Sequence, residues 1–541
     1  MRKLATILIV VAGLSGSAGS SRPASPPLVV TGRPTFFVSG HGWGHGLGLS
    51  QYGAYGYALH GWAYDRILAH YFPGTTLGRA PLTRVRVLVS DGAKRVAISS
   101  KLPFQVLDAT GSSYTLPAGS YTVGASFKRA PDGSPPGTKP QPLLYPLEFR
   151  AGSGALALNG RGYRGSLRVI RNGSALRVVD VVGLEQYLRG VVPSEMPQTW
   201  ASEALKAQAV AARSYALSHL RPAAAFDVYP DTRDQVYLGI PHEAAPTTAA
   251  VKATAGQVLL YRGTVAETFF FSSSGGRTAS LQDLYPASPP IPYLVSVPDP
   301  YDSISPYHDW GPYALTPRRL ARALKAPGRL LDVQTLAGPS GRVRSVLATG
   351  SRGQVSVTGA ELRSALGLRS TWFEVGVLAL GEPAAPVTYG TRALLFGTAR
   401  GVSSVGLQDL GPDGSWQTVA TLNPRGGTVS PWVKPAAPVR YRLVVGPIAS
   451  ASVFVPVAPR VGLQVPNDLS GFWGTVLPAA AGDTVRIQRQ AGSGWRTLAR
   501  AKTDLDGHFT VPVTVAPGTY RARAFAPGFS PGFSPPLAVT G

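Results

Sequence analysis

The stretch from Gln198 to Leu220 contains neither glycine nor proline, although the chain of 541 residues has 63 glycines and 49 prolines. Apolar residues recur within it at steps of three and four, which is the spacing of one buried face of a helix. These residues are Ala204, Leu205, Ala209, Ala212 and Ala216. We therefore expect one long helix here.

A single carboxylate, Glu195, precedes this stretch among apolar neighbours, between Pro193 and Pro197. The prolines restrict the backbone, and the start of the following helix would offer partial positive charge. An apolar setting raises a carboxyl pKa, whereas Lys206 or Arg213 on the helix would lower it. From spacing alone, two interpretations stay open: a capping acid followed by a solvated helix face, or a functional carboxyl.

Composition restricts the partners of the protein. Only 15% of the residues are charged, yet the formal net charge is +24. Such a basic surface attracts polyanions, either nucleic acid or an anionic cell wall. The sequence contains no cysteine. Disulfides, thiolate metal sites, cysteine nucleophiles and lipid-modified cysteines are thereby excluded, and packing alone must hold the fold together.

Residues 1–19 are typical of a secretory signal peptide. Arg2 and Lys3 precede an apolar run from Leu4 to Leu14, and small residues follow. The run is too short to cross a bilayer comfortably, so we expect a secreted, periplasmic or wall-associated protein without a stable membrane span. An uncleaved anchor is the alternative. Residues 20–34 are predicted to form a linker, and export makes nucleic acid the poorer partner.

Strands are predicted for most of the remaining chain. Apolar and polar residues alternate from Arg84 to Leu158 and again from Arg161 to Val182. A repeat of close to 79 residues follows Gly381; it pairs GSWQTVA with SGWRTLA and indicates two small β-sandwiches. We expect Trp416 and Trp495 in these repeats to be core residues, with sugar-binding platforms as the alternative.

The segment from Leu184 to Pro197, followed by Glu203 to Ala216, resembles the SpoIID/LytB domain, the stage II sporulation protein D family. The resemblance covers about Phe36 to Val375. It implies that Glu195 is the catalytic acid of a peptidoglycan lytic transglycosylase and that Arg213 is also required.

The residues from Gly40 to Ala54 also match this family, in its motif GxGxGHGxGxSQxGA. In sporulation members the motif follows the catalytic core, whereas here it precedes the core, as in a circular permutation. The resemblance thus implies that His45, Ser50 and Gln51 reach Glu195. The spacing of His41 and His45 invites a metal site, but that geometry needs a helix and the glycines disfavour one. The alternative is a tight turn whose histidines are bonded by backbone carbonyls.

Some family members bind zinc through a cysteine and histidines near a glycine pair. Phe271, Ser274 and Arg277 stand at those places here, and none of them is a good zinc ligand. We therefore expect no metal and no cofactor. A catalytic serine would need a paired base, and no histidine or lysine is adjacent. The residues expected to bind substrate are Arg213, Lys206, Gln208, Gln235, Ser274, Gly275, Gly276, Thr278, His45, Ser50 and Gln51.

Together these observations predict an α+β fold. Its parts are a module at 35–80, a strand-rich SpoIID/LytB-like core with one long helix at 81–380, and β-sandwich-like modules at 381–457 and 458–541.

The predicted function is cleavage of peptidoglycan glycan strands. A glycosidase normally uses two carboxylates, whereas one stands out here. A lytic transglycosylase needs no protein nucleophile, because the muramic C6 hydroxyl attacks its own anomeric carbon. The resemblance also leaves open a non-catalytic wall-binding modifier that enhances an N-acetylmuramoyl-L-alanine amidase, with that amidase as partner. A purely structural envelope protein would leave the Glu195 motif unexplained.

Overall fold

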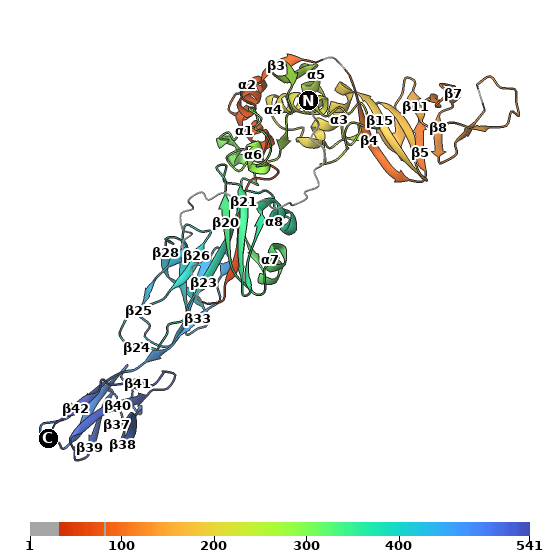
Figure 1. Ribbon diagram of the computed structural model, residues 1–541. Helices are drawn as coiled ribbons and strands as arrows, with labels where there is room; N and C mark the ends of the chain where they lie inside the picture. The colour runs from red at the N-terminus through yellow and green to blue at the C-terminus, as the bar shows by residue number, and fades with distance from the viewer. Residues whose placement is uncertain (1–31, 81–82, 131, 541) are drawn as a thin grey trace, which may run out of the picture.

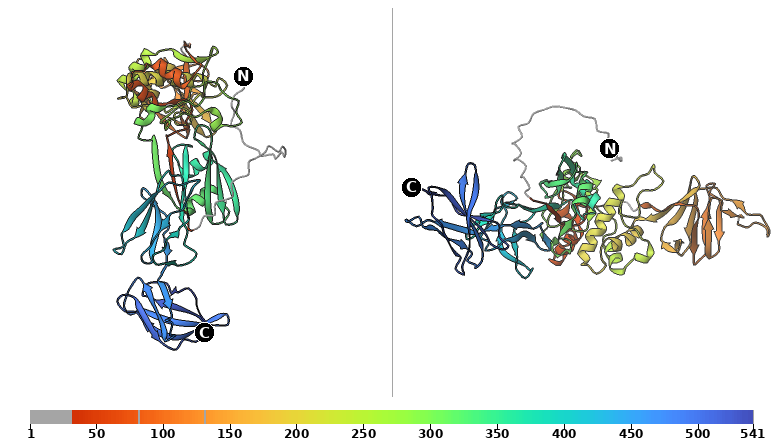
Figure 2. Two further views of the ribbon diagram at one scale, coloured as in Figure 1. Left: turned by 90° about the vertical axis from the view of Figure 1, so that its left-hand side faces the viewer. Right: turned by 90° about the horizontal axis from the view of Figure 1, so that it is seen from below.

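The computed structural model describes residues 32–80, 83–130 and 132–540. The predicted signal peptide lies outside these ranges, as does most of the predicted linker. The described chain is an elongated, strand-rich α+β molecule (Figure 1). A β lobe forms one end and the C-terminal module forms the other, as both Figure 1 and Figure 2 show. Within the described residues, no helix has the length and apolarity needed to cross a bilayer.

The helices cluster around α4, which confirms the predicted long helix. A buried apolar cluster joins α4 to α1 and α2 and includes Leu68, Tyr71, Leu205 and Val210. The helices of this part are α1 (Gln51–Leu59), α2 (Tyr64–Tyr71), α3 (Leu184–Glu195), α4 (Ser202–Ser218), α5 (Ala245–Ala253) and α6 (Leu281–Leu284). A small sheet of β3 (Thr76–Arg79), β16 (Gln257–Tyr261) and β17 (Thr264–Val265) lies beside them.

The β lobe consists of two larger antiparallel sheets and a short pair, β9 (Lys128–Arg129) with β10 (Gln141–Pro142), where the sequence predicts strands. Its core is continuous with the buried faces of α3 and α4. The larger sheet has the order β4 (Arg84–Ala93), β15 (Ala175–Gly183), β14 (Ser166–Asn172), β11 (Leu147–Ala151), β6 (Phe104–Leu107), β7 (Ser113–Leu116). The smaller has the order β13 (Arg161–Tyr163), β12 (Leu156–Leu158), β5 (Val96–Ser100), β8 (Gly119–Val123).

An early strand, β1 (Thr35–His41), lies inside a sheet built from much later residues. It pairs with β19 (Asp309–Leu315) on one side and with β23 (Phe373–Leu380) on the other. The sheet continues from β23 into β26 (Gly397–Arg400) and β29 (Thr428–Val429). Beside it lie β20 (Leu330–Ala337), β21 (Val343–Gly350), β22 (Gly353–Thr358), α7 (Pro317–Leu324) and α8 (Gly359–Leu366). The glycine-rich segment after β1 is thereby fixed between this sheet and the helices.

The two C-terminal modules share one sheet topology, in agreement with the sequence repeat. The first has the order β28 (Trp416–Leu422), β27 (Val405–Leu410), β31 (Val439–Val445), β32 (Ile448–Ala449), with β33 (Val453–Val455) also on β31. The second repeats it as β38 (Gly494–Lys502), β37 (Thr484–Ala491), β40 (Gly518–Phe525), β41 (Gly532–Phe533), with β42 (Leu537–Val539) on β40. In each module a second sheet packs against this one. In the first module it consists of β23, β26 and β29. In the second it consists of β35 (Arg460–Gln464), β36 (Gly471–Leu477) and β39 (His508–Pro512).

The prediction that Trp416 and Trp495 are core residues is wrong. Both are only half-buried and lie outside the apolar clusters of their modules. Instead, the guanidinium of Arg442 lies 4.0 Å from the Trp416 ring centroid, and that of Arg521 lies 4.2 Å from that of Trp495. A cation over an indole face stabilises a partly exposed tryptophan without burying it.

Candidate active site

Glu195 precedes the long helix, as predicted, but it is the last residue of another helix, α3, which the sequence pattern did not predict. Pro193 lies within α3. The long helix α4 begins only at Ser202. The carboxyl therefore stands at the carbonyl end of a helix, where the dipole disfavours negative charge rather than stabilising it.

Two donors hold the Glu195 carboxyl in a partly buried position. The Val236 amide donates to Oε1 at 2.9 Å, and the Gln51 side-chain amide donates to Oε2 at 3.3 Å. Burial raises the pKa of Glu195 above its ordinary value, and these two hydrogen bonds only partly oppose the rise. In the described part of the chain, the groups that shift this pKa include neither a cation nor a second carboxylate. The Glu195 carboxyl therefore keeps its proton to a higher pH than an exposed glutamate does.

Two neighbouring side chains at the end of the glycine-rich segment, Ser50 and Gln51, donate hydrogen bonds to two different acids. Ser50 caps α1 by accepting a hydrogen bond from the Gly53 amide. Its neighbour Gln51 reaches Glu195, as the resemblance implied. Ser50 and His45, which were expected to reach the same carboxyl, bond Asp302 and the Phe270 carbonyl instead. Gly53 is required here, because a Cβ would lie 2.1 Å from the Tyr71 hydroxyl and 2.3 Å from Oδ2 of Asp299.

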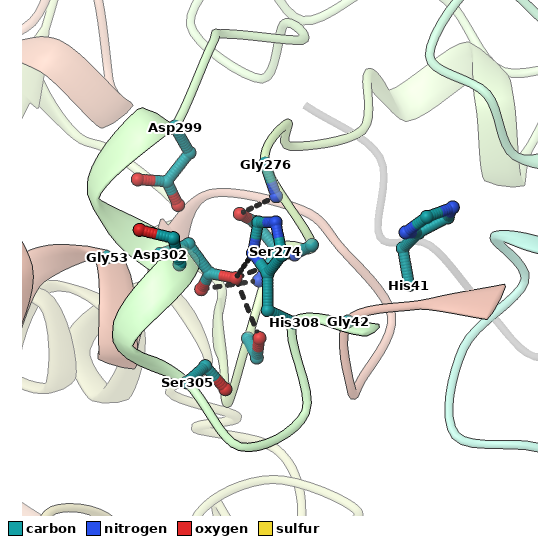
Figure 3. A network of polar contacts seen from close by, with 12 residues as sticks. His41, Gly42, Gly53, Ser274, Gly276, Asp299, Asp302, Ser305 and His308 are labelled. Atoms are coloured by element: carbon teal, nitrogen blue, oxygen red, sulfur yellow. Dashed lines mark hydrogen bonds and ion pairs between the residues drawn. The ribbon is translucent and has the colours of Figure 1, made fainter. Parts of the chain in front are cut away.

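The acid that Ser50 reaches is Asp302, which is fully buried and lies at the centre of a network of polar contacts (Figure 3). Ser50 and Ser273 donate their hydroxyls to it at 2.9 and 2.8 Å, and the amides of Ser274 and Gly275 donate at 2.9 and 2.8 Å. Nδ1 of His308 lies 3.1 Å away. Ser274 and Gly275 are thus occupied in holding the wall of the site together. The Ser274 hydroxyl accepts the Gly276 amide at 3.0 Å, and so it too has a structural partner.

Asp299 lies beside Asp302 and is also fully buried. Tyr71 donates its hydroxyl to Oδ1 at 2.8 Å, whereas Oδ2 has no hydrogen-bond partner. Burial, together with the charge of Asp302, raises the pKa of Asp299 to about 7. Sequence reasoning missed both aspartates. The available signal was a pair of acids three positions apart within an apolar, proline-containing run.

Arg213 lies in the interior with no exposed side-chain surface, and it does not line the surface at Glu195. It forms a bidentate pair with Glu185 at 2.7 and 2.8 Å and donates to the carbonyl of Gln257 at 3.0 Å. These contacts fix α4 against α3 and the small sheet. Lys206 pairs instead with Glu203 on its own helix at 2.6 Å.

Three further residues expected to bind substrate are buried in the framework. The Gln235 side chain accepts from the Tyr187 hydroxyl and donates to the Ala212 carbonyl, which positions the neighbouring Val236 amide. Thr278 bonds backbone groups of Val295 and Val297. Gln208 is fully buried on α4, and neither atom of its amide has a partner.

The two histidines of the glycine-rich segment hold the loop. Nε2 of His45 bonds the Phe270 carbonyl at 3.0 Å, and Nδ1 accepts the Leu47 amide at 3.1 Å. Burial lowers the pKa of His45 to about 4, so it is neutral at physiological pH. The tight-turn alternative is therefore confirmed for His45. It is wrong in detail for His41, whose Nδ1 pairs with the Asp309 carboxylate at 2.5 Å.

A grouping of potential metal ligands within the described residues lies in the C-terminal module. Asp504, Asp506 and His508 are exposed there, in and just after the turn between β38 and β39. Asp504 also accepts the backbone amides of Asp506 and His508, as a turn-forming aspartate does. This grouping belongs to a different module from the one that holds Glu195.

Comparison with known proteins agrees with this geometry. A family model described as stage II sporulation protein matches residues 172–261, which include Glu195 and all of α4. Stage II sporulation protein D of Bacillus subtilis (strain 168) is 31% identical over 264 residues, covering 44% of this chain and 72% of that protein. The chain belongs to the stage II sporulation protein D family.

Other relatives match over shorter shares of their length. An uncharacterized protein of Brachyspira hyodysenteriae is 40% identical over 143 residues, 26% of this chain and 38% of that protein. The amidase enhancer of Bacillus subtilis is 40% identical over 116 residues, 21% of this chain and 15% of that protein. The chain thus spans well under half of both relatives. Among solved structures, a biofilm-associated BSP domain matches with a TM-score of 0.14 and 12% identity over 41% of this chain and 46% of that one, too low to support any argument.

Proposed function

We propose that this protein is a peptidoglycan lytic transglycosylase in which Glu195 is the general acid and base. One observation carries the proposal: a partly buried carboxyl of raised pKa, held by the Val236 amide and Gln51, in a chain of the stage II sporulation protein D family. A carboxyl that keeps its proton near working pH is what protonation of a glycosidic oxygen requires.

The reaction needs no other group from the protein to balance. Glu195 gives its proton to the glycosidic oxygen as the bond between that oxygen and the muramic C1 breaks. The C6 hydroxyl of the same sugar then bonds to C1 and returns its proton to the Glu195 carboxylate. The products are a free hydroxyl on one fragment and a 1,6-anhydro end on the other, and the carboxyl is regenerated.

The remaining residues position the acid. Gln51 and the Val236 amide orient the two oxygens of Glu195. Arg213 holds α4 against α3, which bears Glu195 at its end. The pair Lys206–Glu203 lies on the outer part of α4, and we propose it only as a secondary contact for substrate.

A second candidate function is enhancement of a cell-wall amidase without cleavage. The amidase enhancer of Bacillus subtilis supports it, because the similarity to that protein is 40% identity over its matched segment. The basic composition and the two C-terminal modules suit a wall-binding role in either case. Both functions place the protein at the cell wall, outside the cytoplasm.

The two functions are separated by the products formed from denuded glycan strands. Mass spectrometry should detect anhydro-ended fragments with the wild-type chain, and Glu195→Gln should lower their rate of formation about a thousandfold. Glu382→Gln, which changes an exposed carboxyl elsewhere, is the control and should cleave normally. Reducing-end products would indicate hydrolysis. Glycan binding without cleavage, together with faster release of peptides by an added amidase, would favour the enhancer.

A further inference from the structure

A row of aromatic side chains begins next to the candidate acid. Gln51 and Tyr55 are four residues apart on α1, so the Tyr55 side chain shares a helix face with the amide that holds Glu195. Tyr52 directly follows Gln51 in the same helix. The Tyr55 ring stacks on Trp200 with centroids 4.7 Å apart and planes at 6°. The Tyr52 ring is tilted against Trp200, with the two centroids 4.8 Å apart. Trp200 belongs to the short loop that joins Glu195 to α4.

The row continues across the glycine-rich loop to the neighbouring sheet domain. The Tyr52 and Tyr307 centroids are 6.2 Å apart, and those of Tyr307 and Trp43 are 4.4 Å apart. Trp43 is 41% exposed although it is held by backbone hydrogen bonds to Ser273. A single exposed indole is ordinary, but Trp43 continues a contiguous row of aromatic rings, and contiguous exposed apolar surface is typical of a binding site. We name Tyr55, Trp200, Tyr52, Tyr307 and Trp43 the aromatic strip.

The far end of the strip is cationic. The Arg369 guanidinium lies 4.9 Å from both the Trp43 and the Tyr307 centroids. No carboxylate within the described residues pairs with Arg369. Beside it is a cavity of about 460 Å³ whose lining includes Trp43, Trp310 and Arg319. Aromatic walls with a few placed polar groups are the usual lining of a small-ligand site.

We propose that the aromatic strip binds the glycan strand on one side of Glu195, and that Arg369, with Arg319 in the cavity, takes a carboxylate of that strand. This rests on the proposed function, because the continuity of the strip with Glu195 is what identifies the ligand as glycan. Pyranose rings present flat C–H faces that pack on aromatic side chains, and muramic acid carries a carboxylate that matches a planar guanidinium. Nucleobases also stack on such strips in basic proteins, so single-stranded nucleic acid is the competing ligand that the test must exclude.

The test is calorimetric binding of soluble denuded glycan strands to the full chain carrying Glu195→Gln, which prevents turnover. In this background Trp43→Ala should weaken binding about tenfold. Trp432→Ala removes an indole that is 63% exposed on the first C-terminal module, and it should change nothing. Equal affinities for the two tryptophan variants would overturn the proposal. Circular dichroism establishes that each variant is folded.

Arg369→Gln provides a second measurement that does not depend on Trp43. It should weaken binding of native strands about tenfold and leave binding of strands with carboxylates reduced to alcohols unchanged. An equal loss for both kinds of strand would contradict the carboxylate role. Tighter, Trp43-dependent binding of oligothymidylate than of glycan would overturn the glycan assignment. If strip-dependent binding is found but the wild-type chain makes no anhydro ends, the lytic function fails while the binding site stands.

Discussion

Ser50 and Gln51 are neighbours in sequence, yet they donate to two acids with opposite properties. Ser50 bonds Asp302, a fully buried carboxylate with four hydrogen-bond donors and a nearby histidine. Gln51 bonds Glu195, which has one backbone amide and one long side-chain contact. A buried carboxylate that accepts hydrogen bonds from several groups ties together the segments that supply them and supports structure, whereas a carboxyl with few donors keeps oxygen lone pairs open to a ligand.

The largest expected effect comes from removing Asp302, the carboxylate that accepts four hydrogen bonds. Asp302→Ala leaves four buried or partly buried donors without an acceptor, and we expect the free energy of unfolding to fall by about 5 kcal/mol. Urea titration followed by tryptophan fluorescence measures the loss. Asp309→Ala removes an exposed carboxylate that also faces a histidine, and it should cost under about 1 kcal/mol. Similar losses in the two variants would mean that Asp302 has no special structural weight.

Asp299, the neighbouring acid with one unpaired carboxyl oxygen, should make the free energy of unfolding depend on pH. Its pKa is about 7 in the folded protein and 3.8 ordinarily, so the folded state holds its proton more tightly. The stabilisation is complete below pH 3.8 and is lost as pH rises through about 7, with about 3 kcal/mol lost between pH 5 and pH 8. Asp299→Asn should remove this part of the decline. Asp180, whose pKa burial also raises to about 7, contributes to both curves and cancels in the difference. Parallel curves for wild type and variant would contradict this assignment.

The smallest effect should come from Gln51→Ala. The Gln51 amide stabilises the charged form of Glu195, so its loss should raise the pKa of the acid further. We expect the basic limb of the pH–rate profile to move up by about half a pH unit. Gln354→Ala, at an exposed glutamine on β22, should leave the profile in place. A downward shift would show that Gln51 does not favour the carboxylate.

Local patterns in the sequence were sufficient for the elements but not for the contacts between distant ones. The periodicity around Ala209 predicted α4, and alternation predicted the strands of the β lobe. The same reasoning did not predict α3, the helix that Glu195 ends, because a proline inside a helix is disfavoured and Pro193 is nevertheless accommodated there.

Local sequence patterns could not predict which charged residues pair when they lie far apart in the sequence. Arg213 looked like a surface residue because its partner Glu185 lies on another helix, and Asp302 gave no sign that Ser50 would reach it. Proximity of Gln51 to Glu195 came from family resemblance alone. Trp416 and Trp495 were misjudged because an arginine on the next strand but one supplies the cover that burial would have given.

The position of β1 inside its sheet sets an order of events during synthesis. Strand β1 must wait for β19 and β23, which are made some three hundred residues later, before it has partners. Until then Ser50 lacks its acceptor, Asp302, and the glycine-rich segment is not held by β1. Such long-range pairing is slow to form. The segment that leads into Gln51 is therefore fixed at both ends only after most of the chain has emerged.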